Sequence, residues 1–256
     1  MKIFRFIVAV LLCAAIVVGI VLAAIQMPKR PCSGYDFKVQ YAGEYPAICD
    51  SDICKLIAQN NIPTVGVPLK DVELEKIADL LEQNPYVESV DEVRFSSTKL
   101  KIQVTLKNIL LHVYAQDGSQ YFVDEKGNLL PFSMSVKENV MVANGKIAET
   151  FARGKNIASG KGNLTRVYKI ATCLNDDEFY RAQFRQLYVD AHNEVTLVPT
   201  VGRHIVVFGT EANAQEKLFN LQQTYQKGLV YMGMDAYSTL DLRYKNRVIA
   251  KKRNLI

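Results

Sequence analysis

Tryptophan is absent from this 256-residue chain, and histidine occurs only three times, at His112, His192 and His204. The three histidines lie far apart in the sequence, so none has a spaced partner that would make a metal site or a catalytic set. The chain also lacks a nucleophile elbow, an H-E-x-x-H sequence and a phosphate-binding loop. We therefore expect no catalytic, cofactor-binding or metal-binding residue.

The chain also lacks a large net charge of either sign. Lysine and arginine number 31 against 26 aspartates and glutamates, which gives a formal net charge of +5. The longest basic run, at residues 251–253, lies next to the end of the chain, where such runs are usually solvated tails. The tyrosines are scattered and do not repeat as a base-stacking platform. These features argue against a nucleic-acid partner, and nothing in them indicates a small-molecule substrate.

Cysteine is sparse and not patterned for zinc. Cys49 and Cys54 are close enough to bridge, but their C-x4-C spacing has no second pair and no nearby histidine. Sequence spacing does not fix disulfide geometry. Free thiols and a single Cys49–Cys54 disulfide both remain open.

A long apolar run is present at residues 6–25, with no charge and no proline. Its 20 residues match the length that a helix needs to cross a bilayer and exceed the apolar core of a cleaved signal peptide. Three positive charges precede the run and two follow it, which favours a cytoplasmic N-terminus. The sequence thus predicts a cytoplasmic head at 1–5, one transmembrane helix at 6–25 and an extracytoplasmic remainder.

Residues 34–107 read as a compact module of strand, helix, helix, strand and strand. Leu100, Ile102, Val104 and Leu106 alternate with polar residues, which predicts a strand with these four side chains on its buried face. A second, β-rich domain is expected over residues 108–250, followed by a basic tail at 251–256.

Within that second domain the patterns predict short strands and a few helices. Helical periodicity covers residues 176–188 and 211–227, and Gly228 is expected to end the second of these helices. Alternation of Leu240, Leu242 and Tyr244 predicts that residues 241–250 form the last strand. The fold class is therefore α+β.

Four motifs occur in order along the chain: LEQNPYV at 81–87, KLKIQV at 99–104, YFVDEKG at 121–127 and DLRY at 241–244. With the predicted anchor and module, this layout resembles the bacterial cell division family FtsQ/DivIB, and the module resembles its POTRA domain. The resemblance implies a non-catalytic scaffold of the inner membrane at the division septum, without a cofactor. It also implies an FtsB–FtsL pair as the partner of the β domain, with the POTRA domain used for recruitment.

Two other functions remain open from the residues. One is a POTRA-bearing component of a secretion or outer-membrane assembly system, although such proteins usually carry a barrel or several POTRA copies. The other is an extracytoplasmic enzyme with an unrecognised site, which the lack of a convergent acid–base or metal set disfavours.

The partner site is predicted on the last strand, because no long segment follows to cover its edge. Tyr244 is the expected hot spot, since tyrosine is enriched at such positions, and the alternative is a core tyrosine. Arg243 and Lys245 could steer an acidic partner. The full set of expected contact residues is Leu242, Arg243, Tyr244, Lys245, Asn246, Val248 and, more weakly, Arg185.

Overall fold

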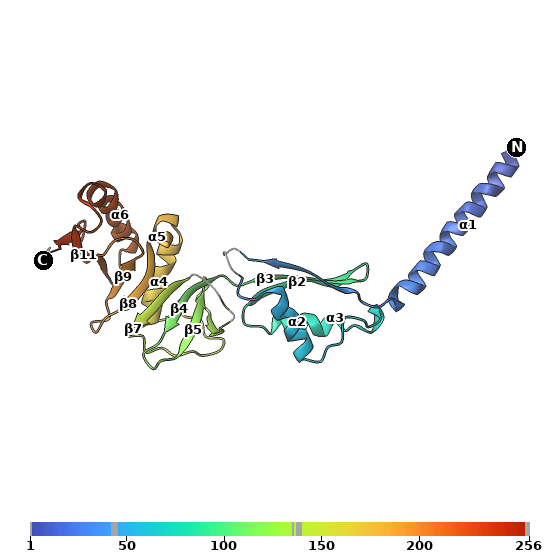
Figure 1. Ribbon diagram of the computed structural model, residues 1–256, viewed down its shortest axis with the longest axis horizontal. Coiled ribbons are helices and arrows are strands. Elements are labelled where there is room, and N and C mark those ends of the chain that lie inside the picture. Colours follow the sequence, from blue (N-terminus) through green and yellow to red (C-terminus); the bar gives the residue numbers. More distant parts are fainter. Residues whose placement is uncertain (1, 42–45, 135, 137–139, 254–256) are drawn as a thin grey trace. The chain divides into compact units, whose positions relative to one another are not determined.

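The computed structural model describes residues 2–41, 46–134, 136 and 140–253. The chain divides into two units (Figure 1). The first is built from the residues up to Tyr41 and from Ile48–Leu106, and the second chiefly from the residues after Leu106. Each unit has a β-sheet of its own.

The apolar N-terminal run forms helix α1 (Lys2–Gln26), which is followed by the short 3-10 turn η1 (Met27–Lys29). Among the described residues, however, no helix has the length and apolar character needed to cross a membrane. This contradicts the predicted transmembrane helix at residues 6–25 and removes the support for a single-pass inner-membrane topology. The prediction counted every residue of the run, whereas the side chains of residues 2–10, 13, 23 and 24 are outside the described part of the structure.

Beyond α1 and η1, the first unit is a three-stranded sheet with two helices. Its elements are β1 (Gly34–Gln40), α2 (Asp50–Gln59), the 3-10 turn η2 (Leu69–Asp71), α3 (Leu74–Glu82), β2 (Val87–Ser96) and β3 (Lys99–Leu106). The sheet order is β1-β3-β2, with β1 parallel and β2 antiparallel to the central β3.

The core of this unit follows from the period-2 pattern of β3. The side chains of Leu100, Ile102, Val104 and Leu106 are all buried, as predicted. Helices α2 and α3 lie along one face of the sheet and carry their own buried apolar residues (Figure 1).

Cys32, Cys49, Cys54 and Cys173 are free thiols. The Sγ of Cys49 lies 2.9 Å from an oxygen of Asp52, at the start of α2. Cys54 lies one turn further along that helix and is unbridged. Of the two alternatives for Cys49 and Cys54, the structure therefore shows free thiols.

The second unit is a nine-stranded mixed sheet in the order β12-β11-β10-β9-β8-β7-β4-β5-β6. The strands are β4 (Ile109–Tyr114), β5 (Gln120–Asp124), β6 (Leu129–Pro131), β7 (Met141–Gly145), β8 (Phe184–Val189), β9 (Val195–Pro199), β10 (Ile205–Gly209), β11 (Tyr237–Asp241) and β12 (Ile249–Lys252). Helices α4 (Asn163–Asn175), α5 (Glu178–Gln183) and α6 (Ala214–Thr224) bury their apolar faces in one core with the sheet.

Two helix predictions are wrong at their ends. The helix expected over residues 176–188 stops at Gln183, because Phe184 starts β8 and pairs with β9. The helix expected to end at Gly228 continues through a π-helical turn, η3 (Tyr225–Leu229), into α7 (Val230–Met232). It ends at Gly233, whose φ of 91° is the left-handed conformation that glycine tolerates.

The buried face of β3 gives a stability prediction. Replacement of Ile102 by Ala should lower the free energy of unfolding by about 2–5 kcal/mol, because it opens a cavity in a fully buried position. The matched control, Gln103→Ala, removes a partly exposed side chain from the opposite face and should cost no more than about 0.5 kcal/mol. Urea unfolding of the two variants measures both values, and equal losses would contradict this core.

Candidate functional site

The predicted last strand is in fact two strands with a turn between them. β11 ends at Asp241, and β12 begins at Ile249. We call the residues between them, Leu242–Val248, the connector. The backbone N–H of Arg243 bonds to the Asp241 carboxylate at 3.0 Å, and Asn246 has a φ of 58°. These local features turn the chain out of the sheet, so the prediction of one continuous strand over 241–250 is wrong.

β12 is one end of the nine-stranded sheet, and all four of its residues are exposed. β6, at the other end, is protected. The N–H of Leu129 bonds to the carbonyl of Lys155 at 3.0 Å, and Pro131 has no N–H to offer. The two ends of the sheet therefore differ, and within the described residues β12 pairs only with β11.

The backbone groups of β12 that face outward can be identified. The carbonyl of Lys251 accepts a bond from the Ser238 hydroxyl at 3.2 Å, and the N–H of Arg253 donates to the Ala236 carbonyl at 3.0 Å. Both groups therefore point toward β11. Because alternate residues of a strand point their N–H and C=O to opposite sides, those of Ala250 and Lys252 point away from the sheet.

The predicted contact residues occupy different environments. Tyr244 is 50% exposed in the connector, whereas Leu242 is 2% exposed and belongs to the core. The alternative of a core tyrosine at 244 is therefore wrong. Lys245 and Asn246 are exposed beside Tyr244, and Val248 packs partly against the core.

Arg185 does not join this group. It lies on β8, which is separated from β11 by β9 and β10 in the order of the sheet. The structure therefore brings six of the seven predicted contact residues together on one segment and leaves Arg185 elsewhere in the sheet.

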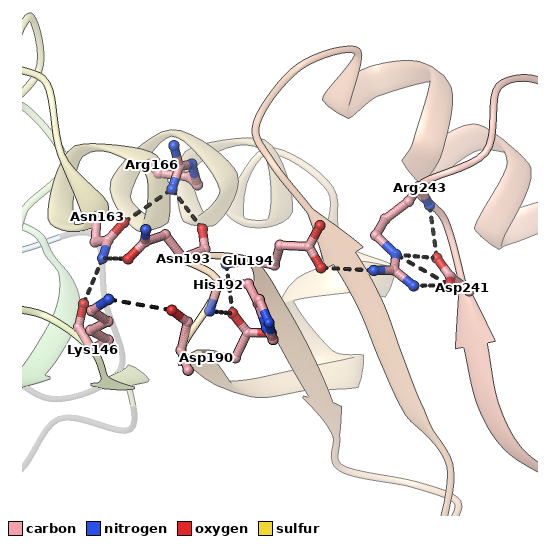
Figure 2. A network of polar contacts seen from close by, with 10 residues as sticks. Lys146, Asn163, Arg166, Asp190, His192, Asn193, Glu194, Asp241 and Arg243 are labelled. Atoms are coloured by element: carbon pink, nitrogen blue, oxygen red, sulfur yellow. Dashed lines mark hydrogen bonds and ion pairs between the residues drawn. The ribbon is translucent and has the colours of Figure 1, made fainter.

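Arg243 is held by two carboxylates (Figure 2). Its guanidinium nitrogens lie 2.9 Å and 2.6 Å from the two oxygens of Asp241, and a third nitrogen lies 2.8 Å from Glu194. The hydrogen bonds from Arg243 lower the pKa of Asp241, and those to Asp241 raise the pKa of Arg243. Sequence reasoning missed Glu194, which is 49 positions from Arg243 along the chain.

The turn that carries Glu194 is fixed in its own right. The carboxylate of Asp190 accepts hydrogen bonds from the N–H groups of His192 and Glu194, at 2.8 Å and 2.9 Å. Asn193, at the tip, has a φ of 63°. An aspartate that bonds the backbone after it is a familiar turn former, so DAHNE at 190–194 was the sequence signal for this turn.

The same turn is tied to α4 (Figure 2). A guanidinium nitrogen of Arg166 donates to the Asn193 carbonyl at 2.6 Å, and another lies 2.9 Å from Glu211. The Asn163 amide also bonds to Asn193, at 2.9 Å. Because the charged groups of this array bond to opposite charges or to backbone groups, the array holds the 190–194 turn against α4 and against the connector.

A family model matches the larger part of this chain. Its description is FtsQ/DivIB, C-terminal related, and the match covers residues 110–251. The matched range includes the connector and most of β12. No curated protein matches the chain.

The histidines lie in three separate places. His204 is buried, and its Nε2 lies 2.6 Å from the hydroxyl oxygen of Tyr225, at the start of the π-helical turn. His112 is half-buried among aromatic rings, and His192 is exposed in the 190–194 turn. No group of three or more potential metal ligands occurs in the part of the chain that the structure describes.

His204 gives a pH prediction. Burial lowers its pKa in the folded protein, so the unfolded chain binds the proton more readily. The free energy of unfolding should therefore fall as the pH drops below about 6.5, the usual pKa of histidine. Denaturant unfolding between about pH 7.5 and about pH 5.5 should show a smaller fall for His204→Gln than for the wild type.

Tyr225→Phe, the control, removes the partner hydroxyl but keeps the imidazole and should retain the fall. An unchanged fall in His204→Gln would contradict the assignment.

Proposed function

Because this chain belongs to the FtsQ/DivIB, C-terminal related family, and so to the cell division proteins, we propose that it binds an FtsB–FtsL pair through β12 and the connector. The family is one of non-enzymatic division proteins, and its members associate with the division septum. In this proposal the protein is a scaffold that links septum-assembly proteins and performs no chemistry of its own.

The observation that carries the proposal is the open edge of β12. The N–H and C=O groups of Ala250 and Lys252 point away from β11, as argued above, and the strand is exposed along its length. An extended segment of a partner can add to such an edge as a further strand, with main-chain hydrogen bonds supplying affinity. The opposite edge, at β6, offers fewer such groups because Leu129 is bonded and Pro131 has no N–H.

Charge supports an acidic partner. Residues 242–253 contain six basic side chains and no acidic one: Arg243, Lys245, Arg247, Lys251, Lys252 and Arg253. The charge of Arg243 is already neutralised by Asp241 and Glu194, so it contributes little to steering. The exposed lysines of the connector and β12 remain to attract a negatively charged segment.

The first unit has a separate proposed role. Its order of strand, helix, helix, strand and strand over residues 34–106 is that of a POTRA-like domain. We propose that it recruits the protein to other division proteins, while the β domain, from about residue 108 to 250, holds the FtsB–FtsL site.

The exposed ring of Tyr244 gives a binding prediction. Tyr244→Ala should weaken binding of the FtsB–FtsL pair by about 2 kcal/mol or more, roughly 30-fold in Kd. The reason is that the variant removes a large aromatic side chain that we propose the partner buries. The melting temperature should stay near that of the wild type, because half of the side chain surface is already in solvent. Isothermal titration calorimetry measures the first value and a thermal melt the second.

Tyr231→Ala is the matched control. Tyr231 is also an exposed tyrosine of the second unit, but it precedes β11, whereas the connector follows that strand. It should bind the pair as the wild type does. If Tyr244→Ala and Tyr231→Ala bind equally well, the partner site is not at the connector.

A further inference from the structure

We infer that Glu194 and Gly209 are positioning residues for the partner site: they hold Arg243 so that Tyr244, the next residue, is presented in one conformation. This inference rests on the proposed function of the connector. It assigns the contacts of the Arg243 side chain to Asp241 and Glu194 of this same chain, and it gives a role to two residues outside the connector.

Arg243 joins the ends of three strands. Asp241 is the last residue of β11, and Glu194 directly precedes β9. The guanidinium bonds to both carboxylates, and the backbone N–H of Arg243 adds a bond to Asp241. A planar guanidinium with five donors can satisfy two carboxylates at once, which a single ammonium group cannot do in the same geometry.

The third strand end is Gly209, the last residue of β10. A Cβ built on Gly209 would lie 2.8 Å from Cγ of Arg243, closer than side chain atoms normally approach. Gly209 also has a φ of 78°, which residues with a side chain rarely adopt. The aliphatic stem of Arg243 therefore crosses the strand end where only glycine leaves room for it.

The connector is pinned on both sides of Tyr244. Before it, the N–H of Leu242 bonds to the Val207 carbonyl at 2.9 Å, and Arg243 is fixed as described. After it, the N–H of Asn246 bonds to the Glu216 carboxylate at 3.2 Å. The intervening side chains, Tyr244 and Lys245, are exposed. A segment held at both ends is already ordered before the partner arrives, so binding loses less conformational entropy.

The fraction of time that the connector spends in the binding conformation sets the apparent Kd. If loss of the Glu194 bond leaves the connector in the competent conformation for about a tenth of the time, the apparent Kd rises about tenfold. The competing explanation is that Arg243 contributes only its positive charge to the partner. Arg243→Lys separates the two, because lysine keeps the charge and loses the fork.

The experiment uses the full chain and the FtsB–FtsL pair as the probe. We expect Glu194→Ala to weaken binding about tenfold and Glu194→Gln, which keeps an acceptor oxygen for Arg243, to restore most of the loss. Arg243→Lys should bind as weakly as Glu194→Ala. Glu178→Ala, an exposed acid at the start of α5, is the matched control and should bind as the wild type does.

A second readout needs no partner. Hydrogen–deuterium exchange at residues 243–247 should be faster in Glu194→Ala and in Gly209→Ala than in the wild type, with the melting temperature nearly unchanged in Glu194→Ala. Unchanged exchange in Glu194→Ala would overturn the inference. Faster exchange with wild-type binding would also overturn it, as would an Arg243→Lys variant that binds as the wild type does. If Tyr244→Ala leaves binding intact, the proposed function fails, and the exchange rates still decide whether Glu194 orders the connector.

Discussion

A β-sheet that does not close must end in two strands whose outer backbone groups have no ladder partner. In the second unit this constraint is met differently at the two ends of one sheet. β6 is short, has one outer amide bonded by the Lys155 carbonyl, and contains Pro131. β12 retains outward N–H and C=O groups at Ala250 and Lys252 along an exposed strand. The connector and the ion pairs of Arg243 lie beside this open end of the sheet and shape the surface that a partner would meet there.

The ion pairs that Arg243 makes with Asp241 and Glu194 contribute little to the free energy of folding. The Arg243 side chain is 42% exposed, and ion pairs at such a surface contribute little to folding. Their effect is geometric. They join the ends of β9 and β11 to the connector, while Asp190 fixes the turn that carries Glu194. Several weak local contacts can hold a binding segment such as the connector in one conformation without adding much to the free energy of folding.

Sequence patterns succeeded where a strand or helix had one clear apolar face, as in β3, where Ile102 and its neighbours are buried. They failed where local and long-range bonds redirect the chain. Leu240, Leu242 and Tyr244 alternate, yet a turn follows because Asp241 binds the Arg243 N–H and Asn246 has a positive φ. The Glu194–Arg243 bond joins residues 49 positions apart, and periodicity carries no information about such a pair.

We propose that the open edge of β12 receives a partner strand. The most direct test is residue-resolved hydrogen–deuterium exchange of the backbone amides of Ala250 and Lys252, with and without the FtsB–FtsL pair. A strand added to this edge should slow exchange at both amides, because each gains a main-chain acceptor. Unchanged exchange at both amides, with slowing at β6 or in the three-stranded sheet instead, would show that the partner binds away from β12.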